Sequence, residues 1–296
     1  MNPDRYALNK LLVKKHFNRA APTYDHAAVL QREVADRMLE RLDLVRLTPA
    51  VTVDVGCGTG HAARRLTRRY RQSRVIGIDL AGEMLKQAQK RESLWQRWRR
   101  RCHWCCADAE HLPLATGSVD LLFTNLTLQW CPNLDAVFRE FHRVLRDGGL
   151  LMFSTLGPDT LTELRQSWRQ VDDANHVSVF MDMHDVGDAL VRHGFATPVM
   201  DVEHFTLTYP DVHRLMRDLK AIGAQNATQG GPRGLTGKST ITRLAAAYEA
   251  FRRNGTLPAT YEIVYGHGWK AAPDQRLPRP PSMAISLDEL LREQRR

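Results

Sequence analysis

The chain of 296 residues contains no apolar run near the roughly 20 residues that a membrane-spanning helix requires. The first residues, Met1–Arg19, are polar and mixed in charge, so they lack the apolar centre of a secretory signal. These two absences favour a cytoplasmic protein that is not bound to a membrane. Hydrophobic residues make up 43% of the chain, enough for one α/β domain or one domain with an added lobe.

Cysteine is scarce, with five residues, and the odd number argues against a disulfide framework. Three of them, Cys102, Cys105 and Cys106, lie near His103 and His111. A structural zinc site needs four ligands, usually in two separated pairs, and the chain has no second pair. We therefore expect reduced thiols and no bound metal.

Acidic residues are in deficit, 33 against 42 Lys and Arg, for a formal charge of +9. This charge suits an acidic partner, whether nucleic acid, carrier protein or membrane surface, without choosing among them. The densest basic run is Arg97–Arg101, with Arg91 and Trp95 just upstream. The run is consistent with RNA binding by phosphate contact and stacking. The interpretation we favour is the solvated end of a helix whose tryptophans pack inward, since charge runs usually lie on exposed faces.

Apolar periodicity predicts a helical N-terminal part, Asn9–Leu44, with a turn at Ala20–Thr23, followed by alternating strands and helices. Alternation of this kind is typical of a doubly wound α/β fold with a parallel sheet. The predicted strands are Val51–Val55, Val75–Ile78, Trp104–Ala107, Val119–Asn125 and Leu150–Thr155, and the helices between them are His61–Arg71, Gly82–Lys90 and Leu134–Leu145.

After Thr155 the alternation becomes irregular. The predicted helices there are Thr160–Gln170, Asp185–His193, Val212–Ile222 and Ile241–Asn254, and the strands are Phe205–Tyr209 and Thr260–Trp269. We expect a helical entry segment (1–48), a main domain (49–270) with a small substrate lobe at about 156–260 over the active site, and a flexible proline-rich tail (271–296).

Three glycines, Gly56, Gly58 and Gly60, follow the first predicted strand and open a helix. Glycine allows positive φ and lets the backbone come close to a ligand. The spacing G-x-G-x-G, with His61 next, differs from the G-x-G-x-x-G of dinucleotide sites. Asp54 precedes the turn, and its carboxylate suits the cationic sulfonium and amino acid of S-adenosyl-L-methionine (SAM), whereas it would repel a pyrophosphate.

Two further acidic residues follow strands. Asp79 ends the second predicted strand, where a carboxylate can accept hydrogen bonds from ribose hydroxyls. Asp108 follows the third strand and is placed to accept from the adenine amino group. The other residues expected around the cofactor are Cys57, Leu80, Met84, Ala109, Asn125 and Leu126.

From Val51 to Thr155 these motifs resemble the class I SAM-dependent methyltransferases, which implies a Rossmann-like fold and SAM as cofactor. The Asn/Asp-Pro-Pro-aromatic motif of adenine and glutamine N-methyltransferases is absent, because residues 125–130 read Asn-Leu-Thr-Leu-Gln-Trp. This disfavours nitrogen methylation of an amide or base and favours a small molecule or carboxylate as methyl acceptor.

The resemblance extends to both ends of the chain. Residues 17–25, 156–164, 183–188, 231–238 and 260–269 resemble the malonyl-acyl-carrier-protein O-methyltransferase family of biotin synthesis. Part of this similarity is shared with a mitochondrial complex I assembly factor that hydroxylates arginine. The resemblance implies methylation of the free carboxylate of a malonyl thioester, carried by acyl carrier protein or by coenzyme A.

Two other classes of function stay open. One is another SAM-dependent reaction, such as methylation of a quinone or other small molecule, or arginine hydroxylation. The other is a SAM-binding module that contacts RNA or protein, although we expect no stable nucleic acid complex. The sequence leaves the oligomeric state undetermined.

The reaction that the resemblance implies needs little acid–base help. A malonyl carboxylate is ionised at neutral pH, so no general base is required, and positioning supplies most of the rate. The lack of an evident Ser-His-Asp set or carboxylate pair is therefore expected.

Two residues are candidates for contact with the substrate. Arg233, in a Gly/Pro loop, could orient the carboxylate by a bidentate contact, with Arg165 as the alternative. Tyr24 could close over the cofactor or donate to the substrate. An exposed loop arginine and a packing tyrosine would look the same. The three histidines His16, His184 and His204 are expected to be structural.

Overall fold

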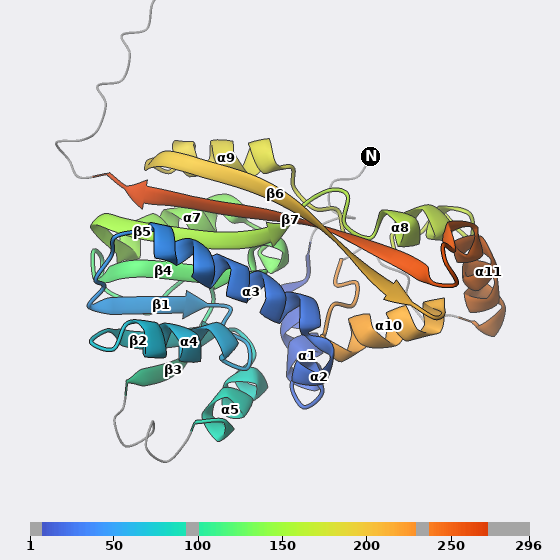
Figure 1. Ribbon diagram of the computed structural model, residues 1–296, viewed down its shortest axis with the longest axis horizontal. Coiled ribbons are helices and arrows are strands. Elements are labelled where there is room, and N and C mark those ends of the chain that lie inside the picture. Colours follow the sequence, from blue (N-terminus) through green and yellow to red (C-terminus); the bar gives the residue numbers. More distant parts are fainter. Residues whose placement is uncertain (1–7, 93–100, 229–236, 272–296) are drawn as a thin grey trace, which may run out of the picture.

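The computed structural model describes residues 8–92, 101–228 and 237–271 (Figure 1). They form a seven-stranded sheet in the order β3-β2-β1-β4-β5-β7-β6. The first five strands are parallel, and β7 is antiparallel to both of its neighbours. Their bounds are β1 (Val51–Val55), β2 (Arg74–Asp79), β3 (Cys102–Cys106), β4 (Val119–Asn125), β5 (Leu145–Leu156), β6 (Phe195–Tyr209) and β7 (Leu257–Lys270).

Helices cover both faces of this sheet, as a doubly wound fold requires. On one face α3 (Val29–Arg41) and α4 (His61–Arg69) pack over β5, β4 and β2. On the other face α7 (Leu134–Val144) and α9 (Met183–Arg192) pack together against the β5–β7–β6 side. Helix α5 (Gly82–Lys90) lies beside β2 and β3.

The helices α1 (Lys10–Ala20) and α2 (Tyr24–Ala27) lie at the carboxyl ends of the parallel strands (Figure 1). Helix α3 follows them across one face of the sheet, and the short helix η2 (Leu42–Leu44) comes after it. Asn9 caps α1, because its side-chain oxygen accepts a hydrogen bond from the Leu12 N–H at 3.1 Å. In the parts of the chain that are described, no helix is long and apolar enough to cross a membrane.

The segment after β5 belongs partly to the sheet. Strand β6 pairs with β7 over nearly its whole length, so the residues expected to form a separate lobe contribute a strand to the main domain. Beyond the sheet, these two strands extend toward three helices, α8 (Thr162–Arg169), α10 (Val212–Ala221) and α11 (Lys238–Tyr248), and η4 (Glu249–Phe251) follows α11 (Figure 1).

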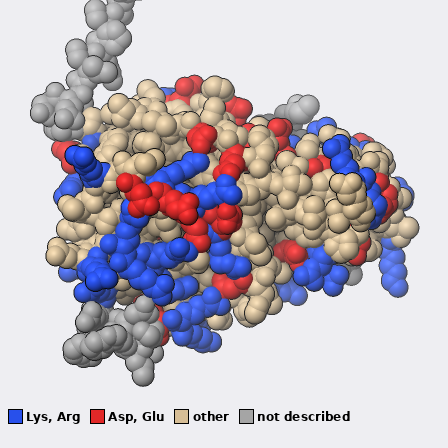
Figure 2. All heavy atoms as spheres, viewed as in Figure 1, with Lys and Arg blue, Asp and Glu red and all other residues tan. Residues whose placement is uncertain are grey.

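Charged side chains cluster over α3 and the neighbouring part of β6 (Figure 2). Arg37 of α3 pairs with Glu203 of β6, and Arg41 pairs with Asp201 at 2.7 Å. These ion pairs join the N-terminal helices to the far edge of the sheet. The charges of this cluster are therefore partly matched by ion pairs within the molecule.

Candidate cofactor site and an adjacent groove

The glycine turn follows β1 and leads into α4, and all three glycines have positive φ, at +70° for Gly56, +52° for Gly58 and +79° for Gly60. A Cβ on Gly56 would lie 2.0 Å from the Thr127 hydroxyl oxygen, and one on Gly60 would lie 2.4 Å from the Trp104 ring. These two glycines are thus required by packing as well as by backbone conformation. The sequence predicted their positive φ and close approach to a ligand, but not these two packing contacts.

Gly58 differs from its neighbours, because the nearest atom to its Cβ position is a ring carbon of Tyr24 at 3.9 Å. Its N–H donates to Asp79 Oδ2 at 2.8 Å, and Asp79 Oδ1 accepts from the Ala81 N–H at 2.8 Å. Burial raises the pKa of Asp79 to about 6, although both backbone hydrogen bonds favour the carboxylate. Burial, and then the Asp79 charge, raise the pKa of Tyr24. The turn, Asp79 and Tyr24 form one contact group.

Asp54 lies deeper, in β1, with 1% of its surface exposed. Burial raises its pKa to about 8. Its Oδ2 atom is buried and has no hydrogen-bond partner among the described residues. An unpartnered buried carboxyl oxygen is costly unless a donor from a ligand or water reaches it, which fits a cofactor with an amino group.

A pocket opens between these residues and α1, with a volume of about 90 Å³. Most of the residues expected around the cofactor line it, namely Tyr24, Gly56, Gly58, Asp79, Leu80, Met84, Asp108, Ala109, Asn125 and Leu126. Asp54, Cys57 and Gly60 lie behind this wall and are not part of the lining. Three predicted features lie outside the described residues. They are Arg233, the basic run except for its last residue Arg101, and the predicted flexible tail from residue 272 onward.

Helix α1 supplies residues to the pocket that sequence reasoning missed. Lys10, Val13 and Phe17 all line it, at the spacing that places them on one face of a helix. Lys10 Nζ contacts Asp108 at 2.7 and 3.0 Å and Glu110 at 2.8 Å. The helical spacing was visible in the sequence, but nothing in it placed α1 above the sheet.

At the end of β4, Asn125 is used structurally. Its amide nitrogen donates to the Gln31 carbonyl at 3.0 Å, and its oxygen accepts from Ser154 Oγ at 2.8 Å. Leu126 follows with φ of +49°, a strained conformation for a residue with a side chain. Its N–H is held by Ser154. This strained corner directs the chain around the pocket.

The helix α2 is tied to the glycine turn by Asp25. Thr59 Oγ1 donates to Asp25 Oδ1 at 2.6 Å, and Arg91, just after α5, forms an ion pair with the other oxygen. Tyr24, the preceding residue, is thereby held next to Gly58. Arg165 does not reach the pocket, because its guanidinium donates to the Pro158 and Thr160 carbonyls, both at 2.9 Å.

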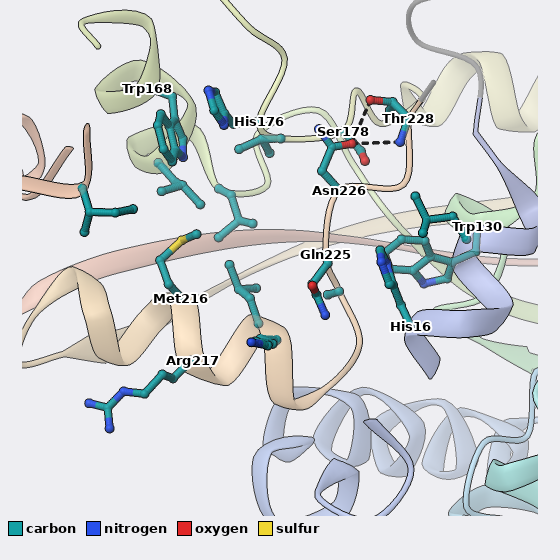
Figure 3. A pocket seen from close by; sticks show the side chains of 18 of the residues that line it. His16, Trp130, Trp168, His176, Ser178, Met216, Arg217, Gln225, Asn226 and Thr228 are labelled. Carbon is teal, nitrogen blue, oxygen red and sulfur yellow. Dashed lines mark hydrogen bonds between the residues drawn. The ribbon is translucent and has the colours of Figure 1, made fainter. Parts of the chain in front are cut away.

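A second and larger cavity, a groove of about 1280 Å³, lies on the other side of α1 (Figure 3). Trp130, from η3 (Leu128–Trp130), lines both the groove and the pocket, and its ring packs edge-on against Phe17 at 5.2 Å. His16 also lines the groove, and burial lowers its pKa. The cofactor pocket and the groove thus meet at Trp130.

Comparison with known proteins places this arrangement in a family. Residues 53–153 match a model described as "Methyltransferase domain". The malonyl-acyl-carrier-protein O-methyltransferase of Methylovorus sp. (strain MP688) is 56% identical over 289 residues, which cover 96% of each chain. That of Laribacter hongkongensis (strain HLHK9) is 55% identical over 91% of this chain and 92% of its own. The chain belongs to the malonyl-acyl-carrier-protein O-methyltransferase family.

Membership of this family makes the protein a methyltransferase with SAM as its methyl donor, as the motifs between Val51 and Thr155 predicted. Solved structures confirm the fold class. A putative methyltransferase from Bacillus halodurans has a TM-score of 0.58 and 16% identity over 80% of this chain and 99% of its own. The YcgJ protein of Bacillus subtilis has a TM-score of 0.56 and 17% identity over 81% and 99%.

Proposed function

We propose that the protein transfers the methyl group of SAM to the free carboxylate of a malonyl thioester on acyl carrier protein, giving the methyl ester used in biotin synthesis. The observation that carries this proposal is the identity of 56% to a relative named for that reaction, over 96% of both chains. The groove beside the pocket supports it, because a thioester substrate needs space next to the methyl donor.

The residues of the pocket suit SAM. Asp79 accepts from the ribose hydroxyls and Asp108 from the adenine amino group, with Leu80, Met84 and Ala109 beside the ring. The glycine turn lies at the amino acid end, with Asp54 and Cys57 behind it, and the strand end at Asn125 and Leu126 lies nearest the methyl group. The cofactor supplies an electrophilic methyl group on a positively charged sulfur.

The volume of about 90 Å³ is below the roughly 300–1,000 Å³ typical of small-molecule sites. Entry of the cofactor therefore requires outward movement of α1 and Tyr24. We infer that the N-terminal segment (1–48) acts as a cap on the main domain (49–270), while the helices within 156–260 form the substrate side.

The chain's own contribution to the reaction is binding and exclusion of water. The malonyl carboxylate is already ionised, so no side chain has to remove a proton. Transfer of the methyl group from the sulfonium to the carboxylate breaks the S–C bond, forms an O–C bond and neutralises both charges, which a dry site favours. Tyr24, above Gly58, closes the cofactor side, and Arg233 is the proposed cation for the carboxylate.

Incubation with SAM and malonyl-carrier protein tests the proposal, with mass spectrometry of the intact carrier as the readout. We expect the malonyl carrier to gain the mass of one methyl group. Acetyl-carrier protein, which has no free carboxylate, is the matched control and should stay unchanged. An unmodified malonyl carrier, or equal methylation of the acetyl carrier, contradicts the proposal.

A further inference from the structure

We propose that the groove beside the cofactor pocket binds the pantetheine arm of the thioester substrate, with Gln225 hydrogen-bonding to an amide of that arm. This inference rests on the proposed function, since it concerns the same substrate. It assigns a binding role to α1, α8 and α10 and to the loop after α10.

Helix α1 is the partition between cofactor and groove. Asn9, Leu12 and His16 face the groove, whereas Lys10, Val13 and Phe17 face the pocket. The two sets are offset by one residue, so they occupy adjacent stripes of one helix. Trp130 alone among the described residues lines both this groove and the cofactor pocket. A substrate in the groove can therefore reach the methyl donor only beside Trp130.

The walls of the groove are apolar for most of their length. Figure 3 shows Trp130 and His16 at one end and Trp168, stacked on His176, at the other, with Met216 of α10 along one side. The rings of Trp168 and His176 are 3.5 Å apart and nearly parallel. The apolar wall residues are Leu12, Leu161, Leu164, Trp168, Val177, Met216, Leu219 and Ile241. A flexible chain with methyl and methylene groups suits such walls.

Isolated polar groups interrupt this apolar surface. The Gln225 amide lies between the two ends of the groove, and it makes no hydrogen bond with any part of the chain that the structure describes (Figure 3). His16 Nδ1 is buried and has no hydrogen-bond partner within the described ranges, and burial lowers the pKa of the ring. A pantetheine arm carries two amides spaced along a largely apolar chain, so it can satisfy such scattered polar groups.

Cations lie on the exposed side of the same groove. Arg217 and Lys220 of α10 line it and are exposed, and neither has an ion-pair partner among the described residues. Their neighbour Arg214, which does not line the groove, pairs with Asp218 at 3.3 Å. The phosphate that joins the arm to its carrier, and the acidic carrier itself, would match these two free cations.

Two thioesters separate arm binding from chemistry: malonyl-pantetheine, which has the arm, and malonyl ethyl thioester, which lacks it. We expect the wild-type kcat/KM to be at least about tenfold higher for malonyl-pantetheine, which corresponds to roughly 1.4 kcal/mol of arm binding. Met216→Trp, which fills the groove, should remove most of that preference and leave the ethyl thioester rate within about twofold. Arg214→Trp, on the outer face of α10, is the control and should keep the preference.

A second, milder substitution tests the arm assignment even if Met216→Trp fails to fold. Gln225→Leu should raise KM for malonyl-pantetheine by about three- to tenfold, the effect of one lost hydrogen bond, with kcat unchanged. Calorimetry with S-adenosylhomocysteine should give wild-type affinity for all three variants. Equal wild-type rates with both thioesters, or equal losses for both in Met216→Trp, overturn the arm assignment. Failure of the wild type to methylate any malonyl thioester, carrier-bound or free, overturns the proposed function and this inference with it.

Discussion

Asp54 and Asp79 are carboxyl groups whose pKa values burial raises, to about 8 and about 6. A carboxyl group that binds its proton more tightly in the folded than in the unfolded state stabilises the fold while it is protonated. That contribution is present at low pH and is lost as pH rises from about 4 through the folded pKa. The cofactor-free protein should therefore lose stability between about pH 4 and pH 8 through these two groups.

The substitution Asp54→Asn removes one of these two titrating carboxyl groups. Denaturant unfolding of Asp54→Asn should show a fall in stability between pH 6 and pH 9 that is smaller than that of the wild type by at least about 1 kcal/mol. Identical pH profiles for the two proteins would show that Asp54 does not titrate in this range.

Asp79 is also the residue on which cofactor affinity should depend most. Asp79→Asn should raise the Kd for S-adenosylhomocysteine at least about tenfold, because hydrogen bonds to a charged acceptor contribute roughly 1.5–3 kcal/mol. Asp188→Asn, at an exposed position on α9, is the matched control. Calorimetry gives both constants, and equal affinities would remove Asp79 from the site.

Alanine substitutions at Gly56 and at Gly117 distinguish the destabilisation caused by a steric clash from that caused by backbone strain. Gly56 and Gly117 have similar φ, +70° and +65°, but only at Gly56 would a Cβ meet a side chain, Thr127. Gly56→Ala should destabilise the protein by about 1–3 kcal/mol more than Gly117→Ala. Urea unfolding of both variants measures the difference, and equal losses would show that Thr127 adapts without cost.

At the scale of secondary-structure elements, we expect the ion pairs of Lys10 to hold the cap helix α1 over the pocket. Lys10→Met removes the contacts to Asp108 and Glu110 while keeping a long side chain at the half-buried position. The cap should then open more often, so S-adenosylhomocysteine should dissociate several times faster in stopped-flow experiments. Lys15→Met, on the exposed side of the same helix, should leave the rate unchanged. A wild-type rate for Lys10→Met would show that this ion pair does not hold the cap.

A fully buried strand and an amphipathic helix were predictable from sequence. The bounds of β4 and α5 agree with the predicted Val119–Asn125 and Gly82–Lys90, since apolar runs and a clear helical period left little ambiguity. Strand β6 was predicted to begin at Phe205 but begins at Phe195, at the edge of the sheet, and between its two buried ends half-buried residues alternate with exposed ones. Strand β5 likewise starts at Leu145 and not at Leu150, since its pairing with β4 continues across a bulge.

The sequence predicted that Asp79 and Asp108 follow strand ends and lie close together, and both line the pocket. The site was not predictable where it depends on contacts between distant segments. Lys10 lies 98 residues from Asp108, and only the three-dimensional path of α1 brings them together. The groove depends on α10 and the loop after it, whose placement no local pattern specifies.

For the whole molecule, the formal charge of +9 predicts salt-dependent association with an acidic carrier. Attraction between exposed charges is screened as ionic strength rises. The kcat/KM for malonyl-carrier protein should therefore fall at least about tenfold between low and high salt. The kcat/KM for malonyl-pantetheine, whose pantetheine arm is uncharged, should change little. Parallel salt dependence for the two substrates would argue against electrostatic docking of the carrier.

A methyl donor in the pocket and a thioester in the groove should meet beside Trp130. A crystal structure of the protein with S-adenosylhomocysteine and malonyl-pantetheine would show directly where both ligands bind. We expect the ribose on Asp79, the cofactor sulfur facing Trp130, and the malonyl carboxylate next to that sulfur with its arm along Gln225. A thioester bound away from the groove, or a cofactor bound away from Asp79, would contradict the account.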